Sequence, residues 1–128
     1  MKAPLIQTSL IETSKMKRIS THVLDIAQGK PAEAVPVHLE RQHGSTWLLL
    51  ATARTDRDGR CSQLLPADDT LVPGTYRLRF DTAAYFAGSQ LVGLYPVVEV
   101  TFFVRDGEQA FHIPLLLSPN GYTTYRGS

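Results

Sequence analysis

The sequence predicts an all-β sandwich with one short helix. Short runs in which apolar and polar residues alternate recur from residue 19 to residue 117, and glycine, proline or aspartate closes most of them. This spacing of short strands and turn signals is typical of a sandwich or a barrel. A chain of 128 residues has room for one hydrophobic core, so we expect a single domain.

The strands are expected in runs whose apolar residues share one face. The clearest is residues 75–82, where Tyr76, Leu78 and Phe80 alternate with charged residues, as in a half-buried strand. In total the pattern predicts about seven short strands. The main runs start at residues 19, 34, 45, 75, 97 and 111 and read ISTHVLD, AVPVHLE, STWLLLATA, TYRLRFDT, VVEVTFFV and FHIPLLL.

Two Asp-Gly pairs mark tight turns, because glycine adopts positive φ angles without strain. One turn contains Gly59, after the third run, and the other contains Gly107. The second turn is expected to join the last two runs as a hairpin. Residues 81–90 form the one predicted helix, with Asp81 or Thr82 as its N-cap.

Composition and charge exclude several classes of protein. With 13 basic and 12 acidic residues, a formal net charge of +1, the chain lacks the basic surface that nucleic-acid binding needs. It has no run of about 18 apolar residues, so we expect no membrane span and a cytoplasmic location. Residues 1–18 are expected to be a loose leader before a domain of residues 19–128. Cys61 is the only cysteine, which rules out an intrachain disulfide and a multi-cysteine metal site.

Four histidines are the main candidates for chemistry. His38 falls on the polar face of its strand and His43 in a loop, so both are expected at the surface. His22 and His112 each interrupt a mainly apolar strand, where an imidazole needs a partner or a role. A buried histidine bonded to a backbone carbonyl explains these two as well as a catalytic role does. No metal, phosphate-loop or nucleophile motif accompanies them.

Three segments together resemble the 5-hydroxyisourate hydrolases, the transthyretin-like enzymes of urate degradation. They are STHVLDIAQGKPA at residues 20–32, TDRDGR at 55–60 and FHIPLLLSPNGYTTYRGS at 111–128. The resemblance implies a transthyretin-like Greek-key β-sandwich of two antiparallel sheets with one short helix. It implies a homotetramer around a central channel, with active sites between dimers and with no cofactor or metal. The implied reaction converts 5-hydroxyisourate to 2-oxo-4-hydroxy-4-carboxy-5-ureidoimidazoline.

The resemblance also implies which residues are catalytic: His22, Arg60, His112 and Ser128. Opening a lactam requires water to lose a proton while negative charge develops on the carbonyl oxygen. An imidazole with a pKa of about 6.5 accepts such a proton near neutral pH. The guanidinium of Arg60 is suited to hold the planar substrate through paired hydrogen bonds. Which histidine is the base stays open; we favour a water held by His112, with His22 orienting it or relaying the proton.

The last four residues belong to the same implied site. Tyr125 and Arg126 are expected to bind substrate by shaping the pocket, with the tyrosine ring anchoring the segment. Gly127 is expected to permit close backbone approach, and Ser128 to bring its hydroxyl toward the substrate. If Ser128 is the terminus, its α-carboxylate is ionised at neutral pH and is expected to orient a neighbouring histidine or arginine.

The main alternative is a non-enzymatic small-ligand carrier like transthyretin. A channel for an apolar ligand is not expected to carry two histidines and an arginine, because each unpaired buried polar group costs about 1–3 kcal/mol. The combination of THV, DGR, FHIP and YRGS therefore favours the hydrolase. An immunoglobulin-like structural module would fit the strand count but leave the terminal motif unexplained.

Overall fold

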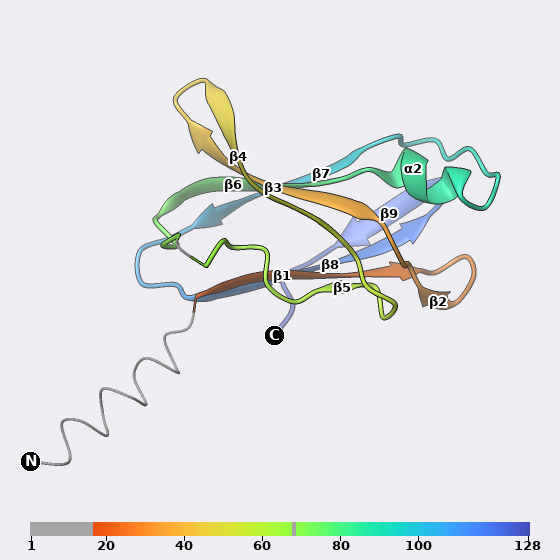
Figure 1. Cartoon of the computed structure of the whole chain (residues 1–128), viewed down its shortest axis with the longest axis horizontal. Coiled ribbons are helices and arrows are strands. Elements are labelled where there is room, and N and C mark those ends of the chain that lie inside the picture. Colours follow the sequence, from red (N-terminus) through yellow and green to blue (C-terminus); the bar gives the residue numbers. More distant parts are fainter. Residues whose placement is uncertain (1–16, 68) are drawn as a thin grey trace, which may run out of the picture.

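Two β-sheets pack face to face in the computed structural model, which describes residues 17–67 and 69–128 (Figure 1). One sheet has four strands, in the order β4 (Thr46–Arg54), β3 (Pro36–His43), β6 (Gly74–Phe80) and β7 (Val98–Val104). The other has the order β2 (Lys30–Pro31), β1 (Arg18–Asp25), β8 (Ala110–Ser118) and β9 (Gly121–Thr124), and β5 (Arg60–Cys61) also pairs with β1. All six main runs predicted from the sequence are strands, so the predicted sandwich is confirmed.

The core lies between the sheets and is filled by alternate residues of each strand. On β6, Tyr76, Leu78 and Phe80 are fully buried, as their alternation predicts. From the facing sheet, β1 contributes Ile19 and Val23, which are also fully buried. Burying a side chain of this kind stabilises the fold by about 1.5–3 kcal/mol. Because alternate side chains of a strand point to opposite faces, Ser20, His22 and Leu24 of β1 face away from the core.

Helix α2 (Thr82–Ala87) lies at one end of the sandwich, where the sequence predicts it. Asp81 is its N-cap, and the Asp81 side chain accepts a hydrogen bond from the backbone N–H of Ala84 at 3.0 Å. The Tyr85 hydroxyl donates to Oδ2 of the buried Asp25 at 2.6 Å. Burial and this hydrogen bond raise the pKa of Tyr85. The helix is therefore tied to the end of β1.

The prediction of a hairpin at Gly107 is wrong. Gly107 has the predicted positive φ, 85°, but its turn crosses from one sheet to the other. β7 pairs with β6, whereas β8 pairs with β1 and β9. A local Asp-Gly signal indicates a reversal of direction but does not say which strands the reversal joins.

The β1 sheet also contains features that the alternation did not predict. β1 and β8 run parallel, the one parallel pair among the strands of the described residues, and all other pairs are antiparallel. The short strands β2, β5 and β9 were not predicted, because segments of two or four residues are too short to show a period.

The expected leader lies outside the described residues except for Lys17 and Arg18, and β1 begins at Arg18. Within the part of the chain that the structure describes, no helix has the length and apolar character needed to cross a membrane.

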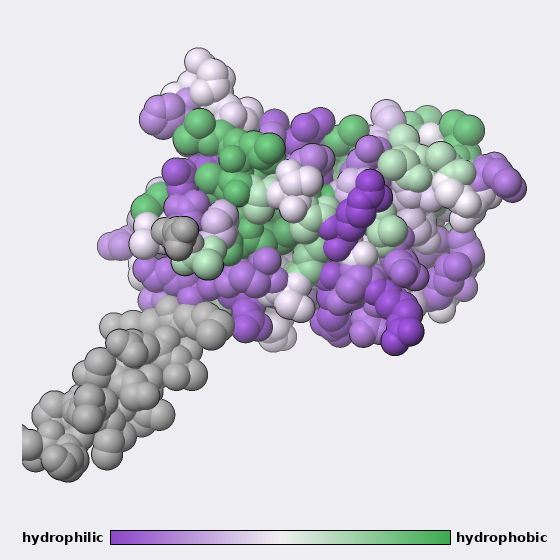
Figure 2. Space-filling model, in the orientation of Figure 1, coloured by the Kyte–Doolittle hydropathy of each residue, from purple (hydrophilic) through white to green (hydrophobic). Residues whose placement is uncertain are grey.

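Pairing brings distant segments together on the outer face of the β1 sheet. Ser20 lies opposite His112 on β8, and His22 lies opposite Arg60 on β5. Figure 1 shows the C-terminus reaching the same outer side, beneath β1 and β5. Figure 2 shows hydrophilic side chains gathered along this edge of the molecule. The fold therefore assembles a polar surface on the side of the sheet opposite the core.

Candidate active site

A hollow of about 320 Å³ opens on the outer face of the β1 sheet. It is bounded by residues of β1, β5, β8 and the C-terminal segment. Most of the residues that line it are polar: two arginines, three serines, one threonine and one histidine. The residues are Arg18, Ser20, Thr21, Arg60, Ser62, Ala110, Phe111, His112, Gly127 and Ser128.

His112 is held on two sides of its ring. Its Nδ1 lies 2.8 Å from the Oγ of Ser20, which is buried. On the other side, the backbone of Gly127 packs so closely that a Cβ there would lie 2.6 Å from His112 Cδ2. Burial, together with the nearby Arg60 and His22, lowers the pKa of His112 below its ordinary 6.5. His112 is therefore neutral at neutral pH, and a neutral imidazole can accept a proton.

His22 is fixed by the turn that follows β4. Its Nε2 lies 2.8 Å from the backbone oxygen of Asp58. A carbonyl oxygen only accepts hydrogen bonds, so Nε2 of His22 carries a hydrogen and donates it. In the neutral ring, Nδ1 is then the nitrogen with a free lone pair.

The turn of residues 56–60 needs glycine at its fourth position. Gly59 has a φ of 81°, and a Cβ there would lie 2.3 Å from the backbone oxygen of Val23. The Gly59 carbonyl accepts from the Val23 N–H at 2.7 Å, which docks the turn on β1. Asp56 Oδ1 accepts from the backbone N–H groups of Asp58 and Arg60, both at 2.9 Å. The TDRDGR motif therefore builds a rigid turn that presents the Asp58 carbonyl to the neighbouring strand.

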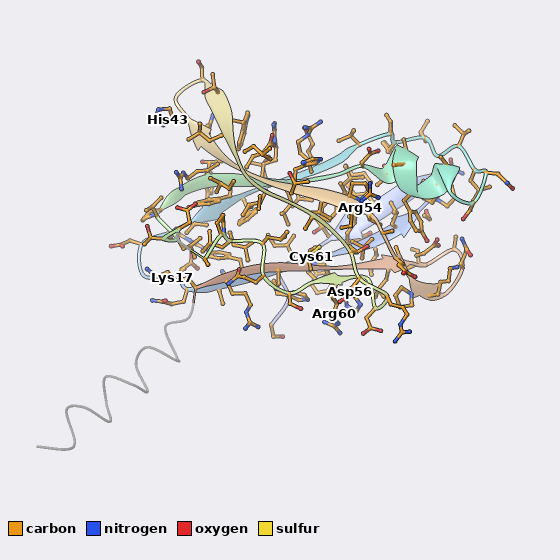
Figure 3. All side chains as sticks on the ribbon, viewed as in Figure 1. Lys17, His43, Arg54, Asp56, Arg60 and Cys61 are labelled. Atoms are coloured by element: carbon orange, nitrogen blue, oxygen red, sulfur yellow. The ribbon has the colours of Figure 1, made fainter. Side chains whose placement is uncertain are left out.

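Strand β5, which begins at the last residue of the turn, directs its two side chains to opposite sides of the sheet. Figure 3 shows Arg60 on the outer side of the sheet and Cys61 toward the space between the sheets. The Arg60 side chain lines the hollow. The thiol of Cys61 is buried. This burial, and to a smaller extent the negative charge of Asp56, raises the pKa of Cys61 to about 11. Cys61 is therefore a protonated core residue rather than a nucleophile.

The C-terminal segment is anchored beside β8. The Gly127 N–H donates to the His112 carbonyl at 2.7 Å, forming an isolated antiparallel bridge. Nη1 of Arg126 pairs with Oε2 of Glu108 at 2.9 Å, and the guanidinium lies 4.4 Å from the centre of the Phe111 ring. Ser128 then reaches the hollow. The segment is thus fixed by backbone and side-chain contacts on both sides of the sheet.

The structure brings together some of the predicted site residues and separates others. Arg60, His112 and Ser128 line one hollow, and His22 is the strand partner of Arg60. Tyr125 and Arg126, expected to shape the same pocket, instead line a separate hollow of about 330 Å³ with Phe102 and Phe103. The guanidinium of Arg126 is paired with Glu108 and packs on the Phe111 ring. A role of Tyr125 and Arg126 in substrate binding stays a prediction.

Sequence reasoning missed Ser20, whose hydroxyl contacts His112. The two residues are 92 positions apart, and nothing in either strand indicates that β1 and β8 are neighbours. The signal that existed was that Ser20 and His22, two residues apart, share one face of β1. His38 and His43 lie on β3, in the other sheet, and neither lines the hollow. In the described ranges 17–67 and 69–128, no three His, Cys, Asp or Glu side chains are grouped to hold a metal ion.

Comparison with known sequences gives a consistent set of relatives. The sequence model of the HIUase/Transthyretin family matches residues 19–127. The mouse 5-hydroxyisourate hydrolase is 46% identical over 112 residues, which cover 86% of this chain and 94% of the mouse protein. The uric acid degradation bifunctional protein of Arabidopsis thaliana is 44% identical over 123 residues, which cover 86% of this chain. The chain spans 37% of the length of that plant protein.

Two of the solved structures that match this chain are proteins of different kinds. The 5-hydroxyisourate hydrolase of Klebsiella pneumoniae has a TM-score of 0.77 and 37% identity, covering 88% of this chain and all of that one (100%). Sea bream transthyretin in complex with thyroxine has a TM-score of 0.79 and 31% identity, covering 85% of this chain and 93% of its own. Since both folds match about equally well, the fold does not decide between catalysis and ligand carriage.

Proposed function

Since the chain belongs to the HIUase/transthyretin family, we propose that it is an enzyme that hydrolyses 5-hydroxyisourate. The observation that carries the proposal is the convergence of His112, Arg60 and Ser128 on one hollow, with His22 beside Arg60. The relatives named 5-hydroxyisourate hydrolase support the same substrate.

In the proposed mechanism His112 is the general base. Water donates a proton to Nε2 of His112, and its oxygen bonds to the lactam carbonyl carbon, whose oxygen takes the negative charge. When the carbonyl re-forms, the carbon–nitrogen bond breaks and the leaving nitrogen takes the proton back from His112. The products of this ring opening are a carboxylic acid and a ureido group. Proton transfer by a positioned side chain contributes on the order of 10²–10⁴ in rate.

The other residues hold substrate and water. Arg60 remains charged throughout the reaction and is suited to bind the planar substrate in a bidentate manner. Ser128 supplies a hydroxyl at the same hollow, where it can hold the water that His112 activates. His22 donates from Nε2 to Asp58 and has Nδ1 left to accept a hydrogen bond from a substrate N–H. The polarity of this set is what separates the hydrolase from an apolar-ligand carrier.

We also propose that the chain assembles as a homotetramer. β7 and β9 are the outermost strands of their sheets, so each has an edge that can pair with a second copy. The hollow between these edges is mainly apolar, and Phe103 at β7 and Tyr125 beyond β9 are 72% and 55% exposed. Large exposed apolar groups next to a free edge are typical of a protein interface. Pairing at these edges would extend both sheets into a second copy and form a dimer, and the step from dimer to tetramer rests on the resemblance to the transthyretin-like enzymes.

One experiment tests the activity. The purified protein is mixed with freshly generated 5-hydroxyisourate, and the loss of its ultraviolet absorbance is compared with spontaneous decay and with a His112→Ala variant. A hydrolase accelerates the decay and the variant does not, whereas a carrier would bind the compound without accelerating its loss. Sedimentation of the active protein tests the tetramer, and a fully active monomer would contradict it. A cytoplasmic location stays a prediction.

A further inference from the structure

Ser20 is a buried residue at the edge of the candidate site. Its side chain is on the outer face of β1, and the residue is only 8% exposed. Its hydroxyl oxygen lies 2.8 Å from Nδ1 of His112. A serine hydroxyl buried to this degree is expected to be hydrogen bonded, and here the bonding partner is the imidazole that we assign as the base.

The His112 ring is clamped at both atoms next to Cγ. Ser20 engages Nδ1 on one side, and the Gly127 backbone packs against Cδ2 on the other. The Gly127 N–H also donates a hydrogen bond to the His112 carbonyl at 2.7 Å. This bond fixes the backbone of Gly127 relative to the backbone of the residue whose ring it contacts. With these two atoms occupied, Nε2 is the ring nitrogen left to meet substrate or water.

We propose that Ser20 is a positioning residue that accepts a hydrogen bond from Nδ1–H of His112 and thereby keeps Nε2 unprotonated for catalysis. The inference deepens the proposed hydrolase function and rests on it for the role of Nε2. If the hydroxyl instead donated to Nδ1, Nε2 would carry the hydrogen, and the neutral ring would have no nitrogen left to accept a proton from water.

The direction of the hydrogen bond also suits the charged intermediate. When His112 takes a proton on Nε2, Nδ1–H still points at Ser20 Oγ, so the same contact persists and strengthens as the ring becomes positive. The contact holds the ring orientation through both proton transfers. Its loss should therefore affect turnover more than substrate binding.

The test uses three variants. Ser20→Ala removes the hydroxyl, and Ser20→Thr keeps it on a strand position that suits a β-branched residue. Ser118→Ala is the control, since it removes another hydroxyl of the same sheet. The Ser118 hydroxyl donates a hydrogen bond to the Gly121 carbonyl at 3.2 Å and does not contact His112. Ser20→Ala should lower kcat on the order of 10- to 100-fold with KM nearly unchanged, the range expected for a hydrogen bond to a charged group. Ser20→Thr and Ser118→Ala should retain most of the activity.

A second readout does not depend on activity. In protein labelled with ¹⁵N-histidine, His112 is assigned by comparison with His112→Gln, and its two nitrogens are observed near neutral pH. Nδ1 should be protonated and Nε2 unprotonated in the wild type and Ser20→Thr, and the preference should be lost in Ser20→Ala. A protonated Nε2 in the wild type, or an unchanged spectrum and kcat in Ser20→Ala, would overturn the inference. If the protein fails to hydrolyse 5-hydroxyisourate but the spectra change as expected, the positioning contact stands and the proposed function fails.

Discussion

Replacing Gly127 by alanine should damage the site without unfolding the protein. A Cβ at this position would lie 2.6 Å from His112 Cδ2 and 3.3 Å from Pro114 Cγ. Ordinary carbon–carbon contacts are about 3.5–4.0 Å, so the ring and the backbone must separate by about 1 Å. Gly127 needs no unusual backbone conformation; the close approach to the ring is what demands glycine.

Moving the His112 ring and the Gly127 backbone apart should lower both the catalytic rate and the free energy of unfolding, by amounts that can be estimated. A misplacement of about 1 Å in a reacting group lowers rate on the order of 10²-fold, so kcat/KM for 5-hydroxyisourate should fall by about that factor. The segment is held at Gly127 by one hydrogen bond to His112, and its loss should cost about 0.5–1.5 kcal/mol of unfolding free energy. We therefore expect residues 125–128 to move away from His112 while the core stays folded.

Gly121→Ala is the matched control. Gly121 lies in the same terminal segment, but a Cβ there would meet only Ser118 Oγ, at 3.9 Å, an ordinary contact. The assays are the decay of 5-hydroxyisourate absorbance and thermal unfolding of both variants. If Gly127→Ala keeps full activity, or if both variants lose it equally, the close approach to His112 has no functional role.

The remaining predictions concern the site itself. His22→Ala and His112→Ala should each lower kcat on the order of 10²–10⁴-fold, while His43→Ala should be nearly neutral; equal effects of all three in steady-state assays would refute the assignment. Arg60→Lys should lose most of its activity with a raised KM, since an ammonium lacks the planar fork; an unchanged KM would argue against substrate contact. Deleting residues 125–128 should abolish turnover while circular dichroism stays that of a folded protein, and full activity would mean that the tail is dispensable. The kcat/KM should decline as pH falls below 6.5, the ordinary pKa of His112.

Local sequence patterns predict most of the sandwich because its main strands have one buried and one exposed face. The alternation in β6 follows directly from the burial of Tyr76, Leu78 and Phe80. Pairing was not predictable in the same way. Gly107 indicates a turn whichever strands it joins, so the expected hairpin could not be distinguished from the crossing between sheets that the structure contains.

The same limit applies to the candidate site. Composition and strand face singled out His22 and His112 but left each with an ordinary explanation, and the resemblance supplied their roles. The structure adds what neither gave: Nε2 of His22 is a donor to a carbonyl, and Nδ1 of His112 faces Ser20. These statements depend on contacts between segments 36 and 92 residues apart, which no local pattern encodes.

The pKa values of Glu108 and His112 are both shifted, and they control two different properties. Glu108 holds the C-terminal segment through Arg126, whereas His112 is the proposed base. Arg126 and Arg105 lower the pKa of Glu108 to about 2, so its ion pair stabilises the fold above its ordinary pKa of 4.5 and is lost only as pH falls toward 2. The pKa of His112 is also lowered, so protonation disfavours the native state and begins to cost stability below 6.5. On acidification His112 therefore loses its lone pair before Glu108 releases Arg126. Activity should fall first and reversibly while the tail remains bound, because the residue that reacts and the residues that hold the tail titrate in different ranges.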